Sequence, residues 1–182
     1  MPDYRRNRVP GGSYFFTVNL RDRRSDLLIT HIESLRRVVR ETRHHLPFHI
    51  DARVVLPDHL HCLWTLPEGD ADFPSRWRVI KASFSKNLPR SAVPIPSGLR
   101  PGERGIWQRR YWEHTIRDER DYAAHMDYIH FNPVKHGFVQ HPGDGEFSTF
   151  RRCVAAGMYP AHWHGDEGSL AIMGERGDSG VG

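Results

Sequence analysis

The sequence predicts an α+β fold in which helices pack on an antiparallel sheet, and three observations support this fold class. Segments rich in β-branched and aromatic residues alternate with segments whose apolar residues recur at helical spacing. The order of these segments is β-α-β-β-α-β-α, which up to its last helix matches the ferredoxin-like βαββαβ motif. A length of 182 residues with 38% hydrophobic residues is enough for one domain with a buried core.

The first half of the chain is predicted to contain one strand, one helix and a hairpin. The helix is amphipathic, with apolar residues on one side and arginines on the others, and Pro47 ends it. A tight Pro57-Asp58 connection then joins two strands, most simply as an antiparallel hairpin. The predicted elements are a strand at 13–20, a helix at 31–45, and strands at 48–56 and 59–66.

The second half is predicted to contain a helix, a surface loop, a strand and a last helix. The loop has four prolines and three glycines and no periodicity, and the last helix begins at the capping residue Asp118 and ends at Asn132-Pro133. The predicted ranges are 72–88 for the helix, 89–105 for the loop and 106–116 for the strand. We expect one domain over 1–140, including a basic N-terminal arm, and a C-terminal tail over 141–182 that is weakly ordered after about residue 165.

Cysteine usage and hydropathy indicate the compartment. Cys62 and Cys153 are too few for a disulfide framework and fit a reducing environment. No apolar run approaches the roughly 20 residues that span a bilayer, and the N-terminus lacks the hydrophobic stretch of a signal peptide. We therefore expect a cytoplasmic protein with no membrane partner.

The basic residues are strongly biased toward arginine. The chain has three lysines and 23 arginines, a pI near 9.3 and five tryptophans. Arginine binds phosphate oxygens in a bidentate way and stacks on bases, so this composition favours a nucleic-acid partner. The codon bias of a GC-rich genome would produce the same excess of arginine.

The pair His59 and His61 is the most informative local feature. Successive side chains of a strand alternate between faces, so both imidazoles project from one face while Leu60, Cys62 and Trp64 project from the other. Two imidazoles on one face can share a metal ion, although such a pair can also be purely structural. In the ferredoxin-like motif helices cover one sheet face, so we expect the histidines on the open face.

A second pair with the same spacing serves as a comparison. His162 and His164 flank Trp163 in the glycine-rich tail, where neither a strand pattern nor a partner helix is evident. We interpret this second pair as incidental.

The last predicted helix offers a nucleophile and a further ligand. Tyr128 and Asn132 are four residues apart and therefore share a helix face, which His125 joins. A tyrosine hydroxyl beside a divalent cation becomes more acidic and is a competent nucleophile, and the cation also polarises a phosphate oxygen. A tyrosine on a helix is more commonly a packing residue, so Tyr128 alone would not establish a reaction.

Three motifs taken together resemble the REP-associated tyrosine transposases, which belong to the wider HUH single-strand transposases. They are Leu-Pro-Asp-His-Leu-His-Cys-Leu-Trp around His59, Trp-Gln-Arg-Arg-Tyr-Trp-Glu-His from Trp107, and Asp-Tyr-Ile-His-Phe-Asn-Pro-Val-Lys-His-Gly from Asp127. The similarity covers roughly residues 4–160. It implies an HUH active site on a central sheet, a single-stranded DNA substrate and a divalent metal such as Mg²⁺ or Mn²⁺.

The resemblance also implies roles for individual residues. His59 and His61 would be metal ligands, Tyr128 the nucleophile that forms a 5′-phosphotyrosine, and Asn132 the third ligand or an orienting residue. The released 3′-hydroxyl could attack the phosphotyrosine in reverse, so strands would be rejoined without ATP. The sequence names no general base. His125 and His130 are candidates by proximity, and solvated surface histidines are the alternative.

Members of this group recognise hairpin-forming repetitive extragenic palindromes (REP) with a single-stranded signal at the hairpin foot. We therefore expect REP-type hairpin DNA as the partner of a nucleoid-associated protein without a nucleotide cofactor, and we favour a monomer. Predicted DNA contacts are basic or aromatic: Tyr4, Arg5, Arg6, Arg8, Arg76, Arg78, Lys81, Trp107, Arg109, Arg110 and Arg117. Trp112 is a further candidate for base stacking, although we expect core packing for at least one of the two tryptophans. The alternatives are a catalytically silent REP-hairpin-binding regulator on the same fold and a metal-dependent hydrolase of a small phosphorylated substrate.

Overall fold

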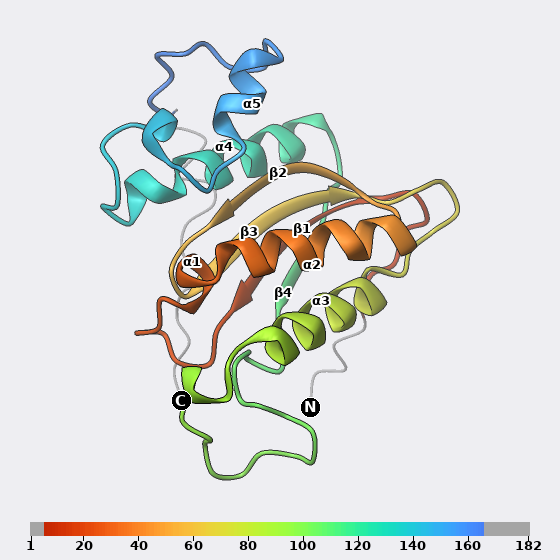
Figure 1. Cartoon of the computed structure of the whole chain (residues 1–182). Helices are drawn as coiled ribbons and strands as arrows, with labels where there is room; N and C mark the ends of the chain where they lie inside the picture. Colours follow the sequence, from red (N-terminus) through yellow and green to blue (C-terminus); the bar gives the residue numbers. More distant parts are fainter. Residues whose placement is uncertain (1–5, 166–182) are drawn as a thin grey trace, which may run out of the picture.

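A four-stranded antiparallel sheet forms the centre of the computed structural model, which describes residues 6–165 (Figure 1). The strands are β1 (Ser13–Asn19), β2 (His49–Val55), β3 (His59–Thr65) and β4 (Trp112–Thr115), and they lie in the order β2-β3-β1-β4. All three pairings are antiparallel. This is the strand order of a βαββαβ sheet, so the predicted ferredoxin-like α+β class is confirmed.

One face of the sheet is covered by α2 (Ile32–His45) and α3 (Phe73–Asn87) (Figure 1). The main hydrophobic core lies between these helices and the alternate residues of β1 and β3. Trp64 of β3 stacks on Trp77 of α3 with ring centroids 4.3 Å apart. The predicted face for Leu60, Cys62 and Trp64 is therefore correct. A short helix α1 (Leu27–Thr30) precedes α2 and was not expected from the sequence.

The opposite face is half closed by α4 (Glu119–Lys135), which packs over β2 and β3. Met126 and Ile129 of α4 form a second core with Val54, Leu63 and residues of the C-terminal segment. The expectation of an open face was thus wrong for the β2/β3 half. The added helix has its own apolar stripe, and this stripe is removed from water only by packing on the sheet.

The last turn of α4 continues past Pro133, where the sequence predicted its end. A proline removes one N–H donor, but near the C-terminus of a helix this loss leaves few later turns to disrupt. Gly137 ends the element instead, with a φ of +73° and an N–H that donates to the carbonyl of Val134. Asn132 therefore stays helical and on the same face as Tyr128.

The strand predicted at 106–116 is regular only over β4. Upstream of it, Trp107 forms a single bridge with Leu20, and the N–H of Gln108 donates to the carbonyl of Asn19. The predicted loop contains one 3₁₀ turn, η1 (Arg90–Ala92).

The segment after Gly137 packs on the domain. It contains the 3₁₀ turn η2 (Pro142–Asp144) and the helix α5 (Phe150–Ala155). Ser148 bridges to Val54 on the outer side of β2, and Phe150 and Cys153 are buried. The weak order expected after about residue 165 concerns residues outside the described part. Within residues 6–165, no helix is both long and apolar enough to cross a membrane.

Candidate active site

His59 and His61 lie on the half-closed face of the sheet, as the strand alternation predicts. Each is 4% exposed, and their ring centroids are 5.0 Å apart. In the pairing of β1 with β3, Asn19 lies opposite His59 and Thr17 lies opposite His61. The two imidazoles are therefore held by a central strand with a neighbour on each side.

Each imidazole is oriented by a hydrogen bond through its Nδ1 atom. Nδ1 of His59 lies 2.8 Å from Oδ1 of Asp58, and Nδ1 of His61 lies 2.8 Å from Oγ1 of Thr17. The Asp58 carboxylate is itself held by the guanidinium of Arg23. With Nδ1 donating, each ring keeps the lone pair of Nε2 for a metal ion, which is the usual arrangement of a metal-binding histidine.

The surroundings keep both rings neutral. Burial lowers the pKa of His59, and the hydrogen bond that its ring donates to the Asp58 carboxylate partly offsets this lowering. Burial also lowers the pKa of His61 well below its usual value, and the positive charges of neighbouring groups, including Lys135, lower it further. A neutral imidazole is the form that binds a metal.

Tyr128 of α4 lies directly against this pair. Its ring centroid is 5.2 Å from that of His61 and 5.9 Å from that of Phe15, both in edge-to-face geometry. The ammonium of Lys135 lies 5.3 Å from the centroid of the same ring. The predicted nucleophile and one predicted ligand are thus brought together from elements about 65 residues apart in sequence.

Asn132 occupies the middle of a row along α4. Tyr128, Asn132 and His136 are spaced by four residues, and the two ends of the row face the histidine pair. The ring centroids of His136 and His59 are 5.2 Å apart, and the ring centroids of Tyr128 and His61 are also 5.2 Å apart. Asn132 itself is 1% exposed.

The side chain of Asn132 provides a test of whether these residues suit a metal. Neither its amide oxygen nor its amide nitrogen has a hydrogen-bond partner among residues 6–165. A buried amide without partners costs free energy, so such a group is normally satisfied by a ligand or water. Two imidazole nitrogens and one amide oxygen form a donor set that fits a divalent metal ion.

Four contributors to this site were missed from the sequence: Asp58, Thr17, Lys135 and His136. Asp58 was interpreted only as a turn residue, although an acidic residue directly before a His-x-His pair is a usable signal for an orienting carboxylate. Thr17 is identified only by the β1–β3 register, which no local pattern specifies. His136 follows from extending the four-residue spacing beyond Pro133, and Lys135 lies seven residues, or about two helical turns, after Tyr128.

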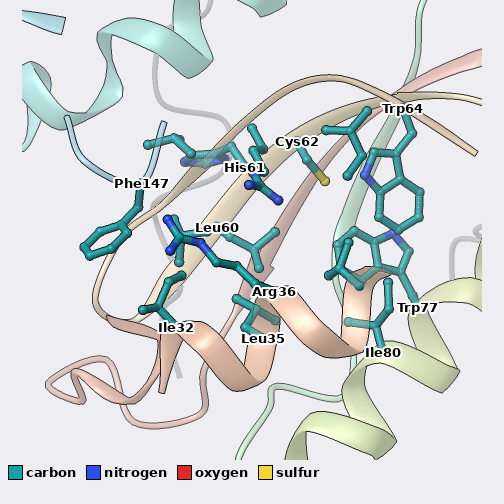
Figure 2. A pocket seen from close by; sticks show the side chains of 15 residues that line it. Ile32, Leu35, Arg36, Leu60, His61, Cys62, Trp64, Trp77, Ile80 and Phe147 are labelled. Atoms are coloured by element: carbon teal, nitrogen blue, oxygen red, sulfur yellow. The ribbon is translucent and has the colours of Figure 1, made fainter. Parts of the chain in front are cut away.

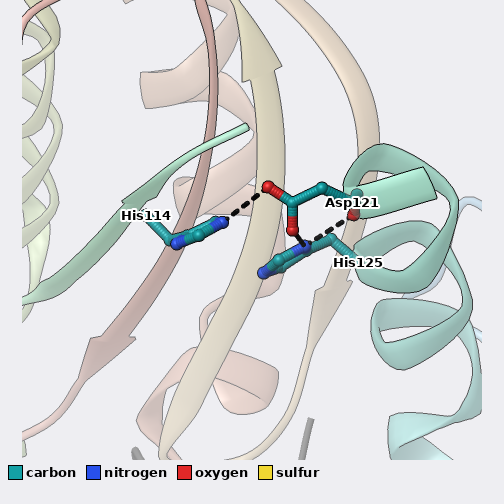
Figure 3. Close-up of side chains that lie close together, drawn as sticks. All are labelled: His114, Asp121 and His125. Atoms are coloured by element: carbon teal, nitrogen blue, oxygen red, sulfur yellow. Dashed lines mark hydrogen bonds and ion pairs between the residues drawn. The ribbon is translucent and has the colours of Figure 1, made fainter. Parts of the chain in front are cut away.

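A second polar cluster lies beside the site and contains His114, Asp121 and His125 (Figure 3). Nε2 of His114 lies 2.8 Å from Oδ2 of Asp121, and Nδ1 of His125 lies 3.2 Å from Oδ1 and 2.8 Å from the main-chain oxygen of Asp121. One candidate ligand atom from each of the three residues lies within 4.8 Å of the others, so the cluster is a possible metal-binding site. As it stands, the carboxylate accepts hydrogen bonds from the His114 ring and the main-chain N–H of Arg117, and the His125 ring donates to the main-chain oxygen of Asp121, so the cluster is satisfied without an ion.

The two histidines considered as general bases are buried rather than solvated. The His125 ring lies 4.7 Å from that of Phe15, on the Tyr128 side of α4 as predicted. His130 faces α5 instead, with Nε2 3.0 Å from Oγ1 of Thr149, and burial lowers its pKa to about 4. The position of His130 gives it no part in chemistry at Tyr128.

Two predicted DNA contacts have roles inside the fold. Arg76 is 2% exposed, and its guanidinium donates to Asp70 and to the carbonyls of Leu46 and Pro47. Trp107 is 9% exposed, and its indole N–H donates to the carbonyl of Lys81. A charge pattern and an aromatic pattern do not reveal which side chains the tertiary fold buries, so these internal partners could not be predicted.

The other predicted contacts within the described part are at or near the surface. Arg6, Arg78, Lys81 and Arg109 line a cleft of about 780 Å³ between α3 and the segment 99–111. Burial lowers the pKa of Lys81 to about 8, and its ammonium donates to the carbonyl of Gln108. Arg8, Arg110 and Arg117 are exposed, and Tyr4 and Arg5 lie outside residues 6–165.

The cavity on the other side of β3 is too small to be a substrate site. It lies between α2 and the sheet, and apolar side chains including Leu35, Leu60 and Ile80 line it (Figure 2). Its volume is about 40 Å³, which is of the order of a single water molecule.

Comparison with known proteins identifies the family. The chain is 51% identical over 166 residues to the REP-associated tyrosine transposase of Escherichia coli (strain K12), covering 91% of this chain and 93% of the relative. This chain belongs to the REP-associated tyrosine transposases. The family resemblance predicted from the three motifs is thereby confirmed. No protein-family model matches the chain.

Two further comparisons agree with the transposase family. A relative with the same family name from Haemophilus influenzae is 43% identical over 176 residues, covering 96% of this chain and 99% of that protein. A solved structure of a REP-associated tyrosine transposase bound to a REP hairpin superposes with a TM-score of 0.80, at 51% identity over 91% of this chain and 93% of that chain. The fold is therefore that of the transposase family.

Proposed function

We propose that this transposase cleaves and rejoins hairpin-forming REP-type DNA through a 5′-phosphotyrosine on Tyr128, with a divalent metal as cofactor. The observation that carries the proposal is the position of the Tyr128 ring, 5.2 Å from His61 on the face that also holds His59. The solved relative bound to a REP hairpin supports the choice of DNA. A nucleophile beside a neutral imidazole pair is what phosphoryl transfer by tyrosine requires.

The metal would be held by Nε2 of His59, Nε2 of His61 and the amide oxygen of Asn132. Support for the histidines comes from their Nδ1 hydrogen bonds, and support for Asn132 from its buried, unpartnered amide. Bound there, Mg²⁺ or Mn²⁺ would neutralise charge that develops on the non-bridging phosphate oxygens. The Lys135 ammonium, 5.3 Å from the Tyr128 ring centroid, adds a positive charge of the protein's own.

The reaction of Tyr128 conserves one phosphodiester linkage. Its hydroxyl oxygen attacks a backbone phosphorus, the bond from phosphorus to the 3′-oxygen breaks, and the strand leaves as a 3′-hydroxyl after taking up a proton. The tyrosine gives up its own proton, and the phosphorus stays bound to the 5′-oxygen and to the tyrosine. Attack by another 3′-hydroxyl reverses these steps, so ligation needs no ATP.

Hairpin DNA would be held mainly through its phosphates. The candidates for these phosphate contacts are the exposed cations Arg8, Arg78, Arg110 and Arg117 and the cleft residues Arg6, Lys81 and Arg109. Tyr4 and Arg5 on the N-terminal arm are further candidates. We favour a monomer acting in the cytoplasm, associated with the nucleoid. The domain would extend over 1–140, with 141–182 as a C-terminal tail.

A covalent-adduct assay tests the proposal. End-labelled REP-type hairpin with a single-stranded foot is incubated with Mn²⁺ or Mg²⁺ and wild type, Tyr128→Phe, His59→Ala or Tyr122→Phe. Tyr122 lies on the same helix and donates to Asp51, so its variant controls for the loss of a tyrosine hydroxyl. Adducts are expected only with wild type and Tyr122→Phe.

The outcomes separate the proposed enzyme from the regulator. An adduct of equal yield with Tyr128→Phe would show that another group is the nucleophile. Equal binding of the hairpin by all four proteins without any adduct would identify the catalytically silent regulator.

A further inference from the structure

Trp112 is exposed on a sheet whose other aromatic side chains are buried. Its exposed fraction is 45%, whereas Tyr14, Phe15, Phe16 and Trp64 are each at most 4% exposed. β4 is an edge strand with β1 as its neighbour in the sheet (Figure 1). A tryptophan with an exposed ring face can stack on a flat ligand, and tryptophan is enriched at binding surfaces.

The strand register places Trp112 on the face of the catalytic pair. Thr17 of β1 lies opposite His61 on one side and opposite Trp112 on the other. Residues directly opposite each other in antiparallel strands point to the same face, and the hydrogen bond between Thr17 and His61 fixes which face this is. Trp112 is therefore two strand spacings from His61, a separation of ~10 Å.

α4 reaches this half of the face at His114, whose ring stacks on that of His125 and bonds to Asp121, but it leaves Trp112 exposed. The helix packs over β2 and β3, and Trp112 makes no ring contact with the aromatic side chains of residues 6–165. His114 lies two residues further along β4, on the same face, and its side chain is 27% exposed. The exposed ring of Trp112 thus forms an open aromatic floor beside the Tyr128 site, next to His114.

We propose that Trp112 is the stacking platform for an unpaired nucleobase of the single-stranded foot, next to the phosphate that Tyr128 attacks. The proposal rests on the proposed function, because the DNA at Tyr128 determines what reaches Trp112. A nucleotide whose phosphate lies at His61 carries its sugar and base to about the distance of Trp112. Arg110, exposed two residues before Trp112, supplies a charge complementary to the next phosphate.

Nucleobases fit this floor better than an apolar peptide does. Every base has a π-face that stacks on an indole, and such stacking tolerates different sequences. The neighbours of the ring are polar or cationic, namely Thr17, His114 and Arg110, which suits a polar base edge and a phosphate rather than an aliphatic side chain. These neighbours favour a nucleobase as the partner of the exposed Trp112 ring.

Binding of two DNA hairpins tests the assignment. All proteins carry Tyr128→Phe, so no covalent step interferes, and affinity is measured for a hairpin with a single-stranded foot and for the same hairpin with a blunt end. Added Trp112→Ala should weaken binding of the footed hairpin about 10-fold, equivalent to ~1.4 kcal/mol, and leave the blunt hairpin unchanged. Trp112→Phe should retain most of the affinity, because a smaller ring still stacks.

The matched control is Met158→Ala, which removes another exposed apolar side chain, 52% exposed, after α5. This variant should bind both hairpins as the parent does. The proposal is overturned if Trp112→Ala binds the footed hairpin with parental affinity, if it loses affinity equally for both hairpins, or if the parent binds neither DNA. Trp112→Ala could lose affinity only for the footed hairpin while the protein that keeps Tyr128 forms no covalent adduct. That result would retain the base site and reject only the proposed function.

Discussion

The chain carries two His-x-His pairs, His59/His61 and His162/His164, with the same spacing and different surroundings. The first is buried in a central strand, and each ring is held through Nδ1 by a hydrogen bond to Asp58 or Thr17. The second lies in irregular chain after Pro160, both rings are exposed, and no hydrogen bond to the described residues holds them. Spacing alone is therefore insufficient for a metal site, since the strand and the orienting partners supply the geometry.

The largest expected difference between the pairs is in catalysis. His61→Ala should slow adduct formation with the footed hairpin by about 1,000-fold or more, because loss of a metal ligand removes several kcal/mol of transition-state stabilisation. His164→Ala should change the rate by less than about 2-fold. Initial rates with Mn²⁺, together with circular dichroism to verify folding, provide the comparison, and equal losses in both variants would remove the distinction drawn between the pairs.

The effect of acid on the free energy of unfolding should also differ between a buried and an exposed histidine. Burial lowers the pKa of His130 to about 4, whereas an unfolded histidine titrates near 6.5. Between these values the unfolded chain binds more protons than the folded chain, so the free energy of unfolding falls as the pH falls. The contribution of His130 is on the order of 3 kcal/mol over this range.

The pH dependence is tested by urea unfolding at pH 7 and pH 4. In His130→Gln the fall in stability between these pH values should shrink by on the order of 3 kcal/mol, because glutamine does not ionise. His44→Gln, at an exposed position on α2, is the matched control and should keep the wild-type fall. An unchanged fall in His130→Gln would show that His130 does not contribute to acid sensitivity.

A smaller effect is expected from the partner that orients His59. Asp58→Asn keeps the shape of the side chain but removes the charge, and should weaken Mn²⁺ binding about 10- to 100-fold. Asp22→Asn removes an exposed carboxylate that pairs with Arg24 and should have no effect. Calorimetric titration with Mn²⁺ measures both, and wild-type affinity in Asp58→Asn would show that the first pair needs no orienting carboxylate.

The smallest effect is expected in the tail. His162→Ala removes an exposed ring with no hydrogen-bond partner among residues 6–165 and should change the free energy of unfolding by no more than ~0.5 kcal/mol. Denaturant unfolding at pH 7 is the measurement. A loss above ~1 kcal/mol would indicate that the second pair is structurally specified after all.

Local periodicity explains what the sequence could predict. Alternation in β3 put His59 and His61 on one face, and the four-residue spacing in α4 put Tyr128 beside Asn132. These relations depend only on the geometry of one element. The predicted element order was correct for the same reason.

What could not be predicted depends on how elements meet. The carbonyls of Leu46 and Pro47 approach α3 only in the folded chain and bury Arg76, which looked like a phosphate contact. Trp107 and Trp112 are equally aromatic in sequence, but Trp107 packs on Phe84 and donates to the carbonyl of Lys81, whereas Trp112 lies on the edge strand β4 and is exposed. The cover that α4 gives to β2 and β3 likewise follows from packing and not from periodicity.

The most direct test of the central claim is a Mn²⁺ titration of three proteins by calorimetry and electron paramagnetic resonance. Wild type and His162→Ala/His164→Ala are expected to bind one ion with equal affinity, and His59→Ala/His61→Ala is expected to lose it. Binding of Mn²⁺ by the His59/His61 variant with wild-type affinity would contradict a metal site at these two histidines. A His114→Ala variant in the same series would then show whether the ion lies in the His114, Asp121 and His125 cluster instead.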